Sequence, residues 1–441
     1  MGQLGAISIL SLTIGLSLYR PRVGRIRIQP ATAAMFGATL TVAVGLLSPL
    51  EAWEVLEFLA RPVLTIVSLM IITIVASQAG FFRMLAWRLA RSAGGNSRRL
   101  FARLFFAGTI TGTLFTNDAA VLIFTPMVYQ LVQEIQEPSW TDANRVPFYF
   151  AVLYVANLVG ALVISNPINI IVADWFDIGF VEYAFWMVLP AVVSMIVTYF
   201  GLVLFFRRSI PKTYRVPTSA AMSASIDSTP RGRKLRVVTA GVLIATLIGF
   251  FSEPWSGIPT AYVAGTGALL LLILHHFFGA ERTRSVITEV GWDVVVFVVG
   301  IFIVANGLRA VGLTDSIGVL LLAASEVGQQ AGIFAAGLIA AVSSAVMNNH
   351  PTAGIMALTI GDLPVDSVTR QGMAFAALIG GDLGPKMLPV GSLAALLWFR
   401  ILRSRGVEIS YWQYVKLGVP VTLAAVVLSL GVLALEYAIF L

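Results

Sequence analysis

The chain contains repeated apolar runs of the length that crosses a lipid bilayer as a helix, which is about 20 residues. Clear examples, some of which need flanking residues to span, lie at residues 7–19, 31–50, 63–79, 237–251 and 262–274. Hydrophobic residues form 58% of the sequence and charged residues only 12%, a ratio that no water-soluble fold of this length needs. We therefore expect an all-α polytopic membrane protein, because a helix satisfies its own backbone hydrogen bonds in lipid.

The basic residues mark one side of the membrane. They gather in clusters separated by acidic or neutral connections, at residues 20–27, 83–103, 207–236, 282–284 and 400–405. Basic connections stay in the cytoplasm, so this alternation predicts that both termini lie outside it. The net charge of +7 is therefore a topology signal, and we expect the lipid bilayer as a partner and no nucleic acid. Residues 207–234, which are polar and rich in Ser, Thr and Pro, form the expected cytoplasmic linker.

The linker separates two halves, residues 1–206 and 235–441, and we expect five crossings in each. The expected crossings are about 3–19, 31–50, 58–79, 147–173 and 183–206, then 235–251, 259–278, 291–311, 369–402 and 412–440. An odd number of crossings turns the second half upside down relative to the first. The sequence thus predicts an inverted repeat, with the substrate site near the bilayer midplane between the repeats.

Two segments, about 99–134 and 330–362, do not fit as simple crossings. Each has two apolar arms joined at a polar tip, Asn117-Asp118 in the first half and Asn349-His350 in the second. A shift of 232 positions superposes one tip on the other. Irregular backbone at membrane depth is tolerated where it is buried in protein or lines a cavity. We expect re-entrant hairpins, the first entering from the cytoplasm and the second from outside.

The fourth crossing of each half is interrupted. Ser165-Asn166-Pro167-Ile168-Asn169 breaks the segment 147–173, and Gly380–Lys386 with Leu388-Pro389 breaks 369–402. Proline and glycine remove helical hydrogen bonds, and half-helix ends direct their dipoles at a ligand. The two hairpin tips and the two broken helices are expected to surround one central cavity.

Four sequence motifs carry a resemblance to a known family: FTNDAAVLIFTPMV, ISNPINIIVADWF, NNHPTAGIMAL and GGDLGPKMLPVGSLAALLW. Together, over nearly the whole chain, they resemble the ArsB-type arsenite and antimonite efflux permeases of the ion transporter superfamily. The last motif is the most specific, because its Asp, Lys, Ser and Trp fall where the family has them. The chain departs from the family pattern at His350, where we expect a methionine.

The resemblance implies a function and a location. It implies export of arsenite and antimonite from the bacterial cytoplasm across the inner (plasma) membrane, coupled to inward proton flow. It also implies a scaffold domain and a transport domain built from the hairpins and broken helices, and it makes a cytoplasmic arsenical-pump ATPase a candidate partner. We expect no cofactor and no metal site.

The candidate substrate-binding residues are amides and a hydroxyl. Arsenite in neutral water is mainly As(OH)3, and the chain has no cysteine thiolates to bond the arsenic. Hydrogen bonds from side chains that both donate and accept are the remaining way to hold three hydroxyl groups. The candidates are Asn117, Asn166, Asn169, Asn348, Asn349 and Thr352.

Three ionisable residues are candidates for proton coupling, because such residues at membrane depth usually mark an ion path: Asp118, His350 and Asp382. Each also has a structural alternative. Asp118 can cap the second hairpin helix, and His350 can bond Asn348 or a backbone carbonyl. Asp382 lies four residues before Lys386, so a structural ion pair that stabilises the broken helix is the alternative there.

Other functions are possible within and outside this fold. A sodium/proton antiporter of the same superfamily suits the acidic residues, and a carrier for another small oxyacid suits the amides. A sodium-coupled carboxylate carrier is disfavoured, because Asp118 repels an anion. A channel is disfavoured as well, because it needs no titratable gate, whereas this chain has ionisable residues within its apolar segments. An enzyme is not expected, because the sequence has no phosphate-binding loop, zinc motif or nucleophile elbow.

Overall fold

The computed structural model describes residues 2–23, 26–135, 137, 140–216, 230–279 and 282–441, without the side chains of residues 23, 26, 117–119 and 393. In the first half the helices are α1 (Gln3–Tyr19), α2 (Pro30–Ala43), α3 (Pro49–Gln78), α4 (Phe81–Ser92), α5 (Ser97–Leu114), α6 (Asn117–Glu134), α7 (Asp142–Val155), η1 (Val163–Ser165), α8 (Pro167–Trp175) and α9 (Phe180–Phe205). Two short antiparallel strands, β1 (Arg22–Val23) and β2 (Ile26–Arg27), connect α1 to α2.

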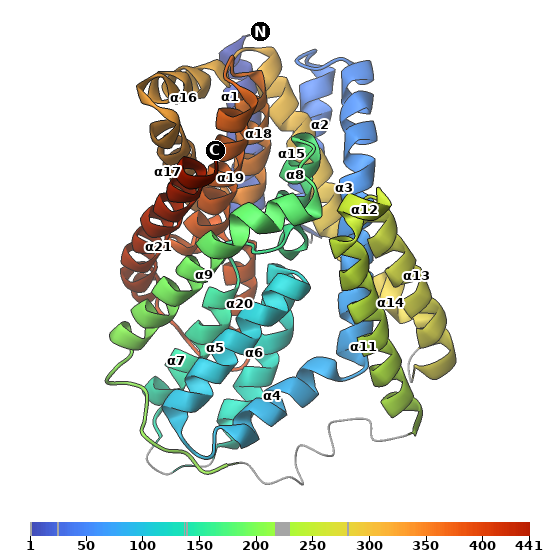
Figure 1. The fold of residues 1–441 in the computed structure, drawn as a ribbon, viewed down its shortest axis with the longest axis vertical. Coiled ribbons are helices and arrows are strands. Elements are labelled where there is room, and N and C mark those ends of the chain that lie inside the picture. Colours follow the sequence, from blue (N-terminus) through green and yellow to red (C-terminus); the bar gives the residue numbers. More distant parts are fainter. Residues whose placement is uncertain (1, 24–25, 136, 138–139, 217–229, 280–281) are drawn as a thin grey trace.

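The second half has a matching series of elements (Figure 1). These are α11 (Pro230–Phe251), α12 (Glu253–Ser256), α13 (Thr260–Phe278), α14 (Thr283–Glu289), α15 (Trp292–Ala310), α16 (Asp315–Val327), α17 (Gln329–Met347), α18 (Asn349–Asp362), α19 (Ser367–Leu383), η2 (Gly384–Lys386), η3 (Pro389–Gly391), α20 (Leu393–Arg403) and α21 (Tyr411–Phe440).

The expected all-helical, polytopic membrane fold is confirmed. Within the described residues, seven helical stretches are long and apolar enough to cross a membrane: 49–78, 180–205, 230–251, 260–278, 283–310, 329–347 and 411–440. Shorter apolar helices are α1 and α2, and the broken helices fall below the length of a single span. One of the seven, α17, is the segment that the sequence analysis takes as a hairpin arm.

Several helix starts differ from the sequence-based expectation, and local capping explains them. Helix α3 begins at Pro49 rather than near residue 58, because Ser48 and Glu51 form a capping box and proline suits the first helical position. Helix α7 begins at Asp142, after a reciprocal cap between Thr141 and Asn144. Helix α11 begins at Pro230, inside the expected linker 207–234, of which residues 217–229 lie outside the description.

Helix pairs in contact repeat between the two halves. Three helix pairs have a counterpart when the helices of the two halves are matched in order. The pair α2–α15 corresponds to α13–α3, the pair α5–α7 to α17–α19, and the pair α6–α20 to α18–α8. Helices α9 and α21, which occupy the same place in each series, pack on each other. These repeated pairs indicate that the two halves share one helix arrangement.

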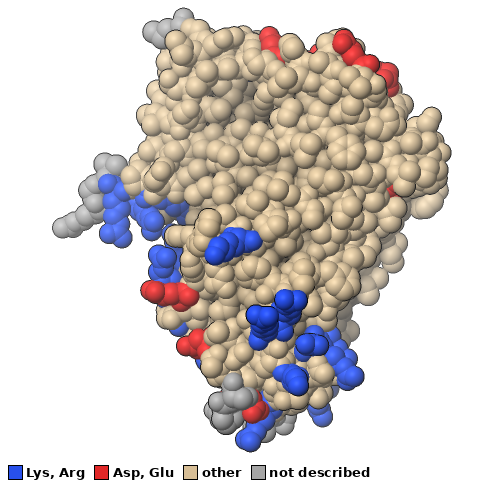
Figure 2. Space-filling model, turned by 90° about the vertical axis from the view of Figure 1, so that its left-hand side faces the viewer, with Lys and Arg blue, Asp and Glu red and all other residues tan. Residues whose placement is uncertain are grey.

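The two helical hairpins lie toward opposite ends of the molecule. Figure 1 shows α5 and α6 in its lower half beside α7, and α17 and α18 in its upper half beside α16. Helices α5 and α6 are joined by Phe115-Thr116, and α17 and α18 by Asn348 alone. Figure 2 shows that Lys and Arg gather on the lower half of one face, while its upper end carries Asp and Glu. On that face the lower end of the molecule is therefore basic, and the upper end carries no cluster of basic residues.

Candidate functional site

The two broken helices meet inside the molecule, and their breaks are closed by side-chain caps. Asn166 begins α8 by accepting from Ile168 N at 3.3 Å, ahead of Pro167 at the first helical position. Ser392 begins α20 by accepting from Ala395 N at 3.1 Å. In the first half a residue of the motif that predicted the break thus also caps the half-helix that follows it, whereas the cap of the second half, Ser392, lies after Leu388-Pro389.

Asp382, at the end of α19, ties the two halves together. It is fully buried, and its carboxylate accepts from Gly160 N at 2.9 Å, Asn166 Nδ2 at 2.6 Å and Asn169 Nδ2 at 3.2 Å. All three donors come from the broken helix of the first half. Hydrogen bonds to an ionised acceptor are among the strongest in proteins, so three neutral N–H donors are a set that would stabilise the carboxylate form of Asp382.

The backbone at Gly160 is shaped for this contact. A Cβ atom there would collide with Asn169 Nδ2 and Ser165 Oγ, and it would lie 3.4 Å from the nearer Asp382 oxygen. The Tyr183 hydroxyl donates to Gly160 O at 3.2 Å and fixes the same loop from α9. Glycine at this position therefore allows the close approach of the loop to the carboxylate.

A second link joins the two breaks a few residues away. Asn157, in the left-handed region at φ 57°, donates through Nδ2 to Ser392 Oγ at 2.8 Å, and both residues are buried. Trp398 Nε1 donates to Tyr149 O at 3.1 Å on the same side. The half-helices α7 and α20 are therefore held together across the repeat boundary.

The expected ion pair between Asp382 and Lys386 is absent, although both side chains lie in the described part of the chain. The carboxylate is occupied by the three donors of the first half. Lys386 Nζ has no hydrogen-bond partner and lies 5.8 Å from the ring centroid of Tyr154. The spacing of four residues does not bring the charges together, because the helix changes to the 3-10 turn η2 at Gly384.

The tip of the second hairpin is organised by Asn348. Its backbone is left-handed at φ 80°, its Nδ2 donates to Gly391 O at 3.0 Å, and its Oδ1 accepts from His350 N at 3.2 Å. The same oxygen lies 3.0 Å from His350 Nδ1, so that ring nitrogen carries a hydrogen. Thr352 Oγ1 donates to Asn348 O at 2.9 Å. This tip therefore packs against the break of its own half.

Some candidate residues keep free hydrogen-bonding groups. Asn349 is 7% exposed and its side chain makes no hydrogen bond to the described residues. Asn169 Oδ1 and His350 Nε2 are buried and have no hydrogen-bond partner in the described part of the chain. The side chains of Asn117 and Asp118 lie outside the description, and only their backbone, at the start of α6, is placed.

The structure sorts the candidates into two groups. Asn166, Asn169 and Asp382 come together at the crossing of the broken helices, whereas Asn348, His350 and Thr352 share the second hairpin tip. The sequence analysis did not single out Asn157, Gly160 or Tyr183, which complete the crossing. Their signal is weak, because one Asn and one Gly in an apolar run do not reveal partners more than 200 residues away.

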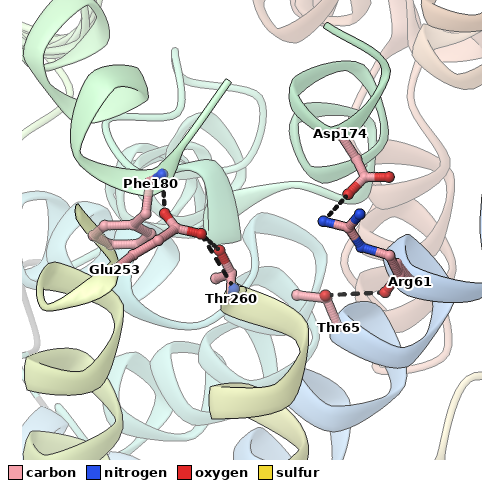
Figure 3. A network of polar contacts seen from close by, with 6 residues as sticks. All are labelled: Arg61, Thr65, Asp174, Phe180, Glu253 and Thr260. Carbon is pink, nitrogen blue, oxygen red and sulfur yellow. Dashed lines mark hydrogen bonds and ion pairs between the residues drawn. The ribbon is translucent and has the colours of Figure 1, made fainter. Parts of the chain in front are cut away.

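Away from the basic end, polar contacts join the corner of α8 and α9 to three other helices (Figure 3). Arg61 of α3 lies 3.4 Å from Asp174 of α8. Glu253 of α12 accepts from Phe180 N at the start of α9, and also from Thr260 N at 3.3 Å and Oγ1 at 3.1 Å at the start of α13. One carboxylate thus caps two helices, which suits their positive N-terminal ends.

Two cavities lie toward opposite ends of the fold. One of about 460 Å³ is lined by Glu51, Glu54, Trp175, Asn306 and Arg309, among others. The other, of about 850 Å³, lies between α3, α4 and α6, and its lining includes Arg83, Tyr129, Gln130, Gln133 and Arg405. The crossing of the broken helices lines neither cavity and is buried.

Comparison of the fold with solved structures finds membrane transporters. Neisseria gonorrhoeae MtrF, described with a class of antimetabolite efflux pumps, superposes with a TM-score of 0.56 at 12% identity, covering 98% of this chain and 94% of that chain. The YdaH transporter of Alcanivorax borkumensis gives a TM-score of 0.54 at 15% identity, covering 99% and 97%. At these identities the likeness concerns the fold alone.

Comparison of the sequence is more specific. An arsenical pump membrane protein of Escherichia coli is 32% identical over 430 residues, which is 97% of this chain and 98% of that protein. One from Yersinia enterocolitica is 33% identical over 434 residues, 98% of each. The profile of the family described as ArsB, arsenical pump membrane protein, matches residues 5–437. The chain therefore belongs to the ArsB family of arsenical pump membrane proteins.

Proposed function

We propose that this chain exports arsenite, as As(OH)3, and antimonite from the bacterial cytoplasm in exchange for protons. The observation that carries the proposal is the crossing of the two broken helices, which is lined by amides and hydroxyls and is buried between two cavities. The family membership supports an arsenical as the substrate. With no cysteine in the chain, recognition rests on hydrogen bonds rather than on bonds to arsenic.

The free polar atoms of the site suit a neutral trihydroxide. Asn349 supplies an unoccupied amide, and Asn169 Oδ1 supplies an unoccupied acceptor for a hydroxyl proton. Asn166, Asn348 and Thr352 hold the surrounding breaks in place through their own hydrogen bonds. Asn117, at the start of α6, completes the proposed set from the first hairpin. Hydrogen bonds between neutral groups are weak, which suits a carrier because it must release the substrate that it binds.

The basic end of the molecule is proposed to face the cytoplasm. The Lys and Arg residues on its lower half agree with the positive-inside rule (Figure 2). Both termini then lie outside, and the 850 Å³ cavity beside α6 opens toward the cytoplasm. The repeated helix pairs support two inverted repeats, residues 1–206 and 235–441, with re-entrant hairpins at about 99–134 and 330–362.

Everted membrane vesicles test the proposal. We expect arsenite to accumulate in vesicles that carry the protein when a proton gradient is imposed without ATP, so that no pump ATPase can contribute. Accumulation should collapse with a protonophore and should not depend on sodium. Vesicles without the protein, and a second set offered antimonite, are the controls. Absence of accumulation under these conditions would refute proton-driven arsenical export.

A sodium/proton antiporter is the second candidate, favoured by the buried carboxylate of Asp382. However, both oxygens of that carboxylate already accept hydrogen bonds from N–H donors. A sodium ion would have to displace these donors in order to bind there. Sodium-dependent proton movement in the same vesicles, with no arsenite accumulation, would establish this second function instead.

A further inference from the structure

Lys386 is a buried amine that the hydrogen bonds of the fold leave unused. It is 2% exposed and lies in η2, in the break between α19 and α20. Its Nζ has no hydrogen-bond partner among the described residues, and it lies 5.8 Å from the ring centroid of Tyr154 on α7. An unpaired charge at this depth is costly, and such groups in a transporter usually serve the transported ion.

The other groups around Lys386 are few. On its own broken helix the charged neighbour is Asp382. Helix α7 presents Tyr154, and α21 presents Tyr414, whose hydroxyl donates to Pro385 O at 3.3 Å. The hairpin arm α17 contributes Ser344, which is uncharged and bonds Gly380 O at 3.2 Å. Among the described residues, the carboxylate of Asp382 is thus the charge that Lys386 can respond to.

Asp382 is poorly placed to exchange a proton. Each of its three partners is an N–H group, so every one of them needs an acceptor. A proton added to the carboxyl group would replace an acceptor by a donor and would break at least one link between the two halves. The amine of Lys386 can gain or lose a proton without breaking a hydrogen bond to any of the described residues, because it makes none with them.

We infer that Lys386 carries the transported proton, while Asp382 stays an anion that holds the two broken helices together. This inference rests on the proposed proton-driven export of arsenite. In each cycle the lone pair of Nζ takes one proton from the outer side, and the ammonium later releases it to the cytoplasm. As(OH)3 leaves unchanged in the opposite direction, so one positive charge moves inward for each arsenite.

The same geometry couples the proton to the motion. One oxygen of Asp382 accepts from both Gly160 N and Asn169 Nδ2. A protonated Lys386 is attracted to that carboxylate and competes with both donors. Protonation therefore weakens the contact between the broken helices, and loss of the proton restores it. This makes the amine a switch for the contact that must rearrange during transport.

Everted vesicles carrying Lys386→Met test the inference, with three readouts. These are arsenite accumulation driven by a proton gradient, arsenite counterflow without a gradient, and proton movement evoked by arsenite, all with the membrane potential clamped at zero. One-for-one exchange supports about tenfold accumulation for each pH unit of gradient. We expect the wild type to accumulate arsenite to that extent. Lys386→Met should show no accumulation above equilibration and no proton movement, yet keep counterflow.

Control variants separate coupling from folding. Lys416→Met removes an exposed lysine that lies over Trp412 on α21, and we expect it to behave as the wild type. Lys386→Arg keeps a permanent charge and should lose coupling as the methionine variant does. Asp382→Asn removes the carboxylate that attracts the protonated amine, so it should also lose coupling while keeping counterflow. If Lys386→Met does not fold, the same three readouts on Lys386→Gln decide the question.

Each outcome has a definite meaning. Gradient-driven accumulation by Lys386→Met, or loss of its counterflow in a protein that is still folded, would overturn the assignment to Lys386. Arsenite-evoked proton movement that persists in folded Lys386→Met but is lost in folded Asp382→Asn would assign the proton to Asp382 instead. Absence of arsenite accumulation in the wild type would refute the proposed function itself, and the inference with it.

Discussion

Asn166 is the residue whose removal should most weaken the crossing of the broken helices. Its Nδ2 donates to the ionised Asp382 at 2.6 Å, and its Oδ1 caps α8 through Ile168 N. A hydrogen bond to a charged group contributes about 1.5–3 kcal/mol, and an N-cap about 1 kcal/mol. Asn166→Ala loses both, so we expect a loss of about 2.5–4 kcal/mol in the free energy of unfolding.

Asn169→Ala is the matched comparison. It loses one donor to Asp382, at the longer distance of 3.2 Å, and it caps no helix. We therefore expect Asn166→Ala to be less stable than Asn169→Ala by about 1 kcal/mol, the contribution of the cap. Unfolding of the detergent-solubilised, substrate-free proteins by denaturant, followed by tryptophan fluorescence, measures the difference. Equal stabilities, or the reverse order, would refute this account of the site.

Three further predictions follow from other parts of the structure. The backbone N–H of Thr369 donates to Asp366, the cap of α19, and lowers the pKa of that carboxyl group. The cap should therefore stabilise the fold at any pH above the ordinary Asp pKa of 3.8, and this stabilisation should be lost as the pH falls through the lowered pKa. Asp366→Asn should remove this pH dependence from acid unfolding, and an unchanged unfolding profile would contradict the prediction. Asp174→Asn should destabilise by no more than about 1 kcal/mol, and the difference should vanish in high salt, because its partner Arg61 is half exposed. His350→Met should keep proton-driven arsenite accumulation in vesicles, since Lys386 rather than the imidazole is assigned the proton; loss of coupling in this variant, with counterflow intact, would count against that assignment.

Much of the architecture follows from local sequence. Apolar runs of bilayer length specify membrane helices, because lipid offers no partner for an unpaired backbone group. Asn166-Pro167 and Leu388-Pro389 mark the breaks, because proline cannot continue a helix and asparagine caps the next one. These signals act over a few residues, which is why the breaks and the helices after them could be predicted.

The partners within the site could not be predicted in the same way. The spacing of Asp382 and Lys386 favoured an ion pair, but the 3-10 turn at Gly384 separates them. The carboxylate instead accepts from residues 213 to 222 positions away in the other half. No local pattern encodes such a pairing, because it depends on how the two halves cross.

The sequence by itself determined that this protein is a membrane carrier with two interrupted helices and two polar tips, since polarity inside an apolar run is a local property. Only the tertiary structure decided which polar groups meet. It brought Asn157 to Ser392 and Gly160 to Asp382, and it left Lys386 without an acceptor among the residues that the structure describes. The physical reason is that buried hydrogen bonds are satisfied by the nearest available group in space, and the packing of the two halves sets that distance.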